Sequence, residues 1–363
     1  MNRFTLLLII LFFGCTILAS GADVKVIEEP TPLFSGLSNA KKLILKRSVE
    51  DIGDKEFDIF AGILSATVDD EGNFYLFDYK HGTVIKMDRE LKFVTSIGRR
   101  GEGPGEFRGK ERTPNFISIG LDKKLYLANW LGRRIIKYSL DGKYLGEVKF
   151  QQFKGVKVAV DEKGNLYLPS IKDHIIDIHD PGMKYKKSLI PIEELKTFLF
   201  LKPPPCVIYR FTIPCYSNIK YDWLSTGELI LVNNYNLSIT ILDPETGKTG
   251  KKFYAWDDYI LSEFKRRIRR ALKRVEEGAS ICGYTFCFRS LFIDNEDNIY
   301  LQFGDFQMIK YLYKFSRSGE LKQVYQIEPA EIDGVPKFFS FKDNKFYSHS
   351  SYGIHIFKEK IEK

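Results

Sequence analysis

The chain of 363 residues has ordinary hydrophobic (44%) and charged (28%) fractions, which exclude disordered, collagen-like and coiled-coil proteins. Its net charge of +8 favours acidic partners. Aromatic residues reach 14% with only 4 Met, and this composition favours strands over helices. By length, the chain forms one large domain or two modest ones.

The N-terminus predicts an export signal. Residues 1–22 combine a short basic start, an apolar run and a small-residue exit, and the run is shorter than the ~20 residues of a membrane span. Ordinary cleavage after Ala22 and lipidation of Cys15, which would anchor the protein to a membrane, both remain open. We therefore expect the periplasm, the cell envelope or the extracellular space as the location, which argues against nucleic acid as a partner.

After a lead-in at 23–40, one phrase recurs through residues 41–363. Each repeat begins with an apolar strand, an acidic or Gly-Asn turn and a strand that usually contains Tyr-Leu. A second pair of strands with alternating apolar and polar residues follows. The phrase occurs at 66–78, 117–129, 158–170, 219–233, 291–303 and 338–350. Period-2 alternation and these turns predict antiparallel hairpins. Six units of four strands predict an all-β, six-bladed β-propeller.

The sixth unit has room for three strands only, because the chain ends soon after it. We expect the N-terminal segment 41–49 to supply the missing strand. Such a strand would close the ring and hide both sheet edges.

Two sequence features resemble the NHL-type repeats of bacterial exported six-bladed β-propeller proteins. The blade phrase is complete as Asp69/Asp70, Gly72, Asn73, Tyr75, Leu76 and Asp78. The glycine-rich segment 98–107 is similar to a loop between early blades of that group. The resemblance implies the fold and an exported protein, but it implies no activity, because propellers host unrelated functions.

Two insertions, 192–217 and 256–286, interrupt the repeat. An even set of cysteines in or beside them, Cys206, Cys215, Cys282 and Cys287, predicts two disulfides in an oxidising compartment, with the pairing left open. Metal binding by these cysteines is the weaker alternative. Residues 257–277 predict a basic amphipathic helix, whose apolar stripe either packs on the propeller or lies on a membrane.

In a propeller, the B–C loops and the D–A connections lie on one face, and the glycine-rich segment and both insertions belong to it. Function is commonly placed on such loops. The candidate binding residues are Asp78, His81, Arg99, Arg100, Asn129, Trp130, Arg133, Arg134, Asn233, Tyr235, Asp305, His349 and Tyr352, with Arg266, Arg269 and Arg270 of the predicted helix. The alternative interpretation is that each is an ordinary turn residue.

No catalytic motif is recognisable, so we expect a non-enzymatic binding or scaffold protein. It would be a monomer without cofactor or resident metal, and its basic face would hold a protein, a glycan or another anionic surface at the cell envelope. The alternative is a metal-dependent, lactonase- or lyase-like enzyme with His81, His349 and Asp305 near the channel mouth. A structural role at the envelope is a third possibility.

Overall fold

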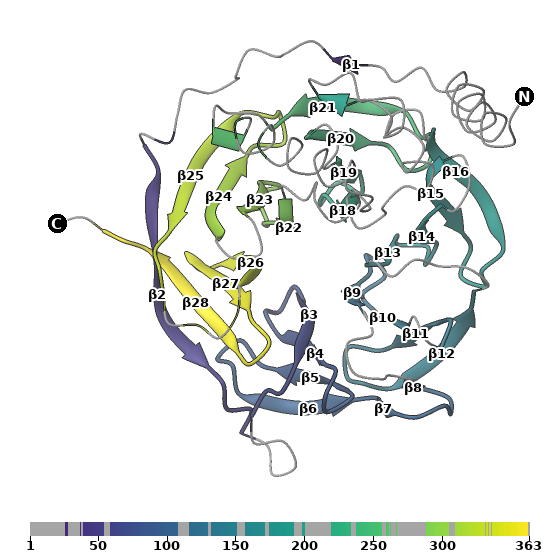
Figure 1. Ribbon diagram of the computed structural model, residues 1–363. Helices are drawn as coiled ribbons and strands as arrows, with labels where there is room; N and C mark the ends of the chain where they lie inside the picture. Colours follow the sequence, from purple (N-terminus) through teal and green to yellow (C-terminus); the bar gives the residue numbers. More distant parts are fainter. Residues whose placement is uncertain are drawn as a thin grey trace, which may run out of the picture.

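The structure is a computed structural model. It describes residues 26–27, 37, 39–53, 59–107, 116–129, 132–150, 157–170, 174–191, 198–199, 219–233, 237–255, 259–260, 262, 266, 288–304, 309–330, 332, 334 and 336–361. Within these ranges the chain forms small antiparallel sheets arranged around a common axis (Figure 1).

The first three blades follow one another in chain order from the inner strand to the outer strand. Blade one contains β3 (Ile63–Val68), β4 (Phe74–Asp78), β5 (Thr83–Met87) and β6 (Phe93–Ile97). Blade two contains β9 (Phe116–Ile119), β10 (Leu125–Asn129), β11 (Arg134–Tyr138) and β12 (Tyr144–Lys149). Blade three contains β13 (Ala159–Val160), β14 (Leu166–Pro169), β15 (His174–His179) and β16 (Tyr185–Pro191).

The remaining blades repeat the pattern. Blade four contains β18 (Ile219–Trp223), β19 (Leu229–Asn233), β20 (Ser238–Leu242) and β21 (Thr249–Tyr254). Blade five contains β22 (Phe288–Ile293), β23 (Ile299–Gly304), β24 (Ile309–Phe315) and β25 (Leu321–Ile327). Blade six begins with β26 (Lys337–Lys342), β27 (Lys345–His349) and β28 (Ile354–Glu359).

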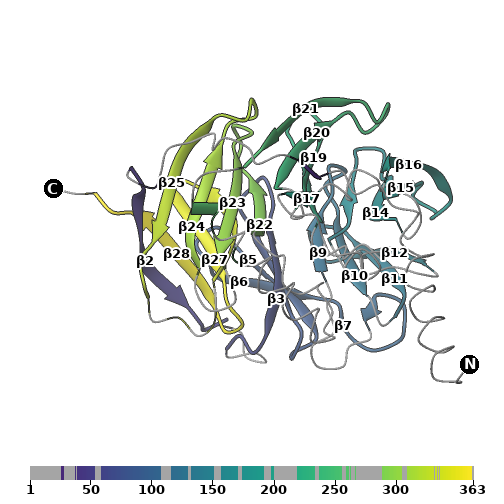
Figure 2. The same cartoon turned by 45° about the horizontal axis from the view of Figure 1, so that its top comes forward.

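The N-terminal strand β2 (Lys41–Val49) completes blade six. It pairs antiparallel with β28, and its first residues also pair parallel with β25 of blade five. Figure 2 shows β2 along the outer edge beside β28. The predicted closing strand and the six-bladed architecture are therefore confirmed.

The middle strands are more buried than alternation predicts. All five residues of β4 are buried, as are those of β10 and β19. The outer strand β6 keeps the alternating pattern of exposed and covered residues. The reason is that a middle strand has a neighbouring blade on both faces, so both of its faces must be apolar. Large buried rings such as Tyr300, Phe303 and Tyr313 fill these spaces.

The recurring Asp–Asn–Tyr phrase builds the turn between the first two strands of a blade. In blade one, Asp69 accepts hydrogen bonds from the Asn73 backbone amide at 2.8 Å and from the Asn73 side chain at 2.9 Å. The hydroxyl of Tyr75 donates to Asp69 at 3.1 Å and to the Leu140 carbonyl of blade two at 3.0 Å. Burial and Asp69 raise the pKa of Tyr75. The phrase thus shapes its own turn and ties one blade to the next.

We call the edge of the ring with these turns the turn face. The opposite edge, which carries the B–C loops and D–A connections, is the loop face. Two short parallel pairs were not predicted: β7 (Arg99–Arg100) with β8 (Glu106–Phe107), and β1 (Val26–Ile27) with β17 (Phe198–Leu199).

The predicted helix 257–277 lies largely outside the described residues. Tyr259, Ile260, Ser262 and Arg266 are helical. Ile260 is buried in the cluster formed by blades four and five, as expected for the predicted apolar stripe. The rest of the helix stays a prediction.

Candidate functional site

The glycine-rich segment forms a compact loop on the loop face, directly after blade one. Parallel pairing of β7 with β8 brings its two ends together, and Glu106 accepts a hydrogen bond from the Gly103 amide at 2.9 Å. The Tyr138 hydroxyl of blade two donates to the Gly105 carbonyl at 2.6 Å. The loop is therefore held in one conformation by its own backbone and by the next blade.

Gly98 starts this loop, and its position requires glycine. Its φ is +68°, and a Cβ atom there would lie 2.7 Å from both the Phe107 ring and the Tyr138 hydroxyl. A side chain would therefore be strained by the backbone conformation and by lack of space.

Arg134, a candidate from the sequence, lies inside this arrangement. Its guanidinium donates to the carbonyls of Glu102, Gly103 and Glu106 at 3.4, 3.3 and 2.7 Å. It also forms an ion pair with Glu147 at 3.1 Å, and only 7% of the residue is exposed. Arg134 therefore supports the loop from within.

Four other cations remain exposed around this loop, and we call them the cationic rim: Lys80, Arg99, Arg100 and Arg133. Arg99 pairs with Glu106 at 2.6 Å. The hydrogen bond from the Gly103 amide, and then Arg99, lower the pKa of the Glu106 carboxyl.

Two contacts join the rim to its neighbours. Arg100 donates to the carbonyls of Tyr79 and Lys80 at 2.9 and 3.0 Å, so the D–A loop rests on the B–C loop of blade one. The Lys80 ammonium lies 5.9 Å from the ring centroid of Tyr352, an exposed aromatic residue of blade six. The rim therefore covers loops of blades one and two and contacts the neighbouring loop of blade six.

The candidates at the ends of the second strands are buried. Asp78 accepts hydrogen bonds from the amides of Ala61, Lys80 and His81 at 2.7, 3.0 and 3.3 Å, and His81 Nδ1 lies 3.2 Å from its carboxylate. Asn129 accepts from the Gly132 amide at 2.6 Å. Both residues shape B–C turns, and Asn233 is buried at the corresponding place.

His349 lies beneath the surface of blade six. His349 is only 4% exposed, and burial, together with the charge of Lys337, lowers the pKa of its imidazole to about 3. Nearby His355 bridges Ser48 of the closing strand and Ser350 at 3.0 and 2.9 Å. Burial lowers the pKa of His355 to about 4, so both imidazoles are neutral at ordinary pH.

Several candidates lie outside the described residues: Cys15, Trp130, Cys206, Cys215, Tyr235, Arg269, Arg270, Cys282, Cys287 and Asp305. Arg266 is described as half-buried on the helical segment. The disulfides and the lipidated cysteine therefore stay predictions. Among the described residues, no group of three His, Cys, Asp or Glu side chains could hold a metal ion.

The sequence analysis missed a second set of cations, Lys220, Arg289 and Lys337, which we call the inner cation cluster. Each occupies one of the first two positions of an innermost strand, in blades four, five and six. The sequence did contain a signal for this cluster, because one cation stands near the start of each of three largely apolar strands. The sequence alone could not show that these strands are neighbours.

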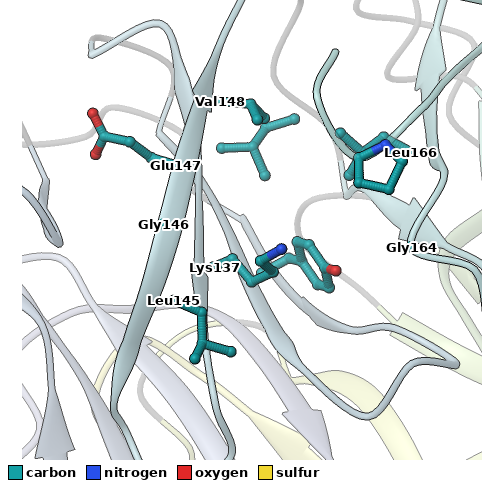
Figure 3. Close-up of a pocket in the computed structure, with 10 residues that line it drawn as sticks. Lys137, Leu145, Gly146, Glu147, Val148, Gly164 and Leu166 are labelled. Carbon is teal, nitrogen blue, oxygen red and sulfur yellow. The ribbon is translucent and has the colours of Figure 1, made fainter. Parts of the chain in front are cut away.

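Two grooves lie away from these residues. One, of about 160 Å³, opens between blades two and three, where Lys137, Leu145 and Leu166 border it (Figure 3). The other, of about 300 Å³, lies on the turn face beside Asp161, Asp243 and Glu245. Neither contains a residue that the sequence analysis selected.

Comparisons with known proteins agree with this architecture. A family described as a 6-bladed beta-propeller matches residues 61–175. A Bacteroides fragilis protein described as exported has a similar structure, with 12% identity, coverage of 93% of this chain and 99% of that chain, and a TM-score of 0.56. A search of curated proteins finds no significant match.

Two further solved structures are less similar. A Bacteroides thetaiotaomicron protein shares 11% identity, with 91% of this chain and 75% of that chain covered and a TM-score of 0.49. Virginiamycin B lyase from Staphylococcus aureus shares 11% identity, with 87% and 99% covered and a TM-score of 0.48.

The strand order and the family match define the chain as a six-bladed β-propeller protein. In the part of the chain that the structure describes, no helix is long and apolar enough to cross a membrane.

Proposed function

We propose that this protein is an exported, non-enzymatic binding propeller that holds an anionic partner on its loop face. The observation that carries the proposal is the cationic rim on a preformed loop. Arg99, Arg100 and Arg133 project from segments fixed by the Arg134 and Tyr138 hydrogen bonds. Clustered positive charge attracts an anionic partner and accelerates its encounter with the protein.

The rigidity of the loop supports binding because the conformational entropy of the loop is already lost during folding. A flexible loop would lose conformational entropy when the partner arrives, whereas this loop is already hydrogen-bonded to blade two. The exposed ring of Tyr352 beside Lys80 adds an apolar contact within the charged surface. Aromatic residues and arginine are the side chains most enriched at binding hot spots.

Export is proposed from the N-terminal sequence. Residues 1–22 have the charge and hydropathy pattern of a signal peptide, and the Bacteroides fragilis relative is described as exported. Lipidation at Cys15 would anchor the protein to a membrane, and the mass of the mature N-terminus distinguishes it from simple secretion. The arginines of the predicted helix, Arg266, Arg269 and Arg270, would extend the basic surface.

The test is charge reversal of the cationic rim. Lys80→Glu, Arg99→Glu and Arg133→Glu are combined, and Arg100 is kept because it supports the loop. Binding to immobilised heparin, a polyanionic glycan, and to vesicles containing phosphatidylglycerol should weaken by about tenfold or more. The melting temperature should hardly change, because exposed charges contribute little to stability.

Lys251→Glu is the matched control, because Lys251 is exposed on β21 of blade four and lies outside the rim. Retention of heparin and vesicle binding by the triple variant would refute the proposal. Loss of binding in both the control and the triple variant would show only a general effect of net charge, and would also count against the proposal.

The metal-dependent alternative has one supporting observation. Asp78 lies 3.2 Å from His81 Nδ1, and a carboxylate often orients a metal-ligating histidine in this way. Elemental analysis of protein purified without chelators tests it, because an enzyme of that class requires a stoichiometric divalent ion.

A further inference from the structure

We propose that the groove between blades two and three binds a small monocarboxylic acid with an apolar body. We call it the interblade groove. Its volume is about 160 Å³, and it lies toward the turn face, where Gly164 and Pro181 of blade three border it. The groove is separate from the cationic rim on the loop face, so this site does not rest on the proposed function.

The groove lies where a tyrosine and a lysine recur as cross-strand neighbours on the second and third strands of a blade. The three pairs are Tyr75–Lys86 in blade one, Tyr126–Lys137 in blade two and Tyr300–Lys314 in blade five. In each blade the tyrosine packs in the apolar cluster shared with the next blade. Blade two can therefore be compared with two blades that are built in the same way.

The lysine has a partner in blades one and five but not in blade two. Lys86 donates to the Leu140 carbonyl at 3.0 Å, in the turn of the next blade. Lys314 lies 3.7 Å from the Asp294 carboxylate. Lys137 is half-buried, and among the described residues it has no hydrogen-bond or ion-pair partner. Its ammonium group is therefore available to a ligand.

A glycine opens the space beside this lysine. At the neighbouring position of the outer strand, blade one has Thr95 and blade five has Gln323, but blade two has Gly146. A Cβ atom on Gly146 would meet no atom within 4 Å. The φ of Gly146 is +127°, which other residues rarely adopt. The backbone therefore keeps this position free of a side chain.

The walls of the groove are apolar. Leu145 and Val148 of β12 border it on one side, and Leu166 and Pro181 of blade three border it on the other. The Tyr126 hydroxyl already donates to Asp122 at 2.8 Å, so this residue offers only its ring. Leu145 is 40% exposed, and an apolar ligand that covers it gains free energy from the burial.

The charge of the groove favours an anionic head group. Among the described residues that border it, Lys137 is the one cation. Glu147 points away from Lys137 in Figure 3 and forms an ion pair with Arg134 at 3.1 Å. The nearby Asp122 carboxylate is balanced by Lys124 at 2.8 Å. A single carboxylate on the ligand would therefore neutralise the remaining charge through a charge-assisted hydrogen bond.

The volume of the groove limits the apolar body of the ligand. A cavity of about 150 Å³ holds one benzene molecule, so the interblade groove, at about 160 Å³, has room for one aromatic ring or a short alkyl chain. The carbons of a long-chain fatty acid would extend into solvent. A compact aryl or alkyl carboxylic acid is therefore the best fit.

The test is ligand-observed NMR titration of the purified protein with 3-phenylpropionate. Two matched probes each lack one of the two contacts: 3-phenylpropanol has the ring without the charge, and acetate has the charge without the ring. 3-Phenylpropionate should bind about tenfold more tightly than either probe, or more.

Lys137→Met removes the charge and keeps an unbranched apolar side chain. It should weaken the binding of 3-phenylpropionate about tenfold and leave that of 3-phenylpropanol unchanged. Lys137→Arg should retain binding, because it keeps the charge. Lys149→Met is the matched control, since Lys149 is exposed on the same strand and lies outside the groove. Leu145→Ala should weaken the binding of both phenyl compounds about threefold, because it shortens one wall.

Absence of saturable 3-phenylpropionate binding at millimolar concentration would overturn the proposal, as would equal binding by Lys137→Met and the wild type. Tighter binding of a peptide that ends in phenylalanine would overturn the assignment to a free acid. Thermal melts establish that the variants fold, and Leu145→Ala, at an exposed position, provides the test if Lys137→Met does not. The rim variant Arg99→Glu should bind 3-phenylpropionate normally, so failure of this site and failure of the proposed function are distinguishable.

Discussion

The two faces of the ring differ in regularity. On the turn face, Asp161 with Asn165 and Tyr167 repeats the hydrogen bonds made by Asp69 in blade one. Asp294 with Asn298 and Tyr300 repeats them again in blade five. On the loop face, Asp78 and Asn129 each accept a hydrogen bond from the amide three residues further along the chain, whereas the exposed cations gather on the loops of blades one and two.

This difference teaches how to interpret a repeated motif. A carboxylate that recurs in blade after blade satisfies the same backbone groups each time, so its recurrence reflects the needs of folding. Side chains that appear once, such as Arg133 or Lys220, have no such role in every blade. Binding is therefore more reasonably sought among the residues that depart from the repeat.

The largest effect should come from opening the ring, on which both faces depend. Removal of residues 41–49 deletes β2, whose Leu43 is fully buried, and breaks its pairing with β28 and β25. The edge of β28 would then be unpaired. We expect loss of cooperative unfolding in calorimetry and loss of native near-ultraviolet circular dichroism. An unaltered melting curve would contradict the closure of the ring by this strand.

The second prediction concerns the turn face. Asp294→Ala removes the acceptor for the amides of Glu296 and Asn298, for the side-chain amide of Asn298 and for the hydroxyl of Tyr300. At about 1 kcal/mol for each of these four donor groups, the free energy of unfolding should fall by about 4 kcal/mol. Urea denaturation measures this free energy of unfolding.

Asp141→Ala is the control for this prediction, because 95% of the Asp141 side chain is exposed, and its effect should stay below about 0.5 kcal/mol. Equal stability of both variants would remove the structural role assigned to the repeated motif.

The smallest effect on stability should have the opposite sign. Lys220 is destabilised in its charged form by burial and by two neighbouring cations. Lys220→Gln should therefore leave the free energy of unfolding unchanged or raise it by up to about 1 kcal/mol, after allowance for solvent contact. A loss of more than that amount would place Lys220 among the residues that support the fold.

Much of the fold could be predicted from local sequence. The turn phrase, the apolar strands and their spacing recur in each unit, and such signals act over a few residues. Counting strands then identified 41–49 as the missing one. Full burial of the middle strands was not predicted, because it results from blades packing on both faces of β4, β10 and β19.

The candidate site was predicted less well. Asp78 and Asn129 were selected as polar residues at the starts of loops and Arg134 as a residue near one, yet the structure buries all three as supports of the backbone. A polar residue that binds a partner and one that caps a turn look alike in sequence. Only the position of the surrounding amides and carbonyls distinguishes them.

The sequence by itself determined the class of fold and the closing strand, because hydrogen-bonded turns and strand periodicity are local properties. Only the tertiary structure decided which charges meet. Lys220, Arg289 and Lys337 are far apart along the chain, and the ring brings their strands side by side. Electrostatic interaction depends on distance through space, so no local pattern could have predicted that cluster.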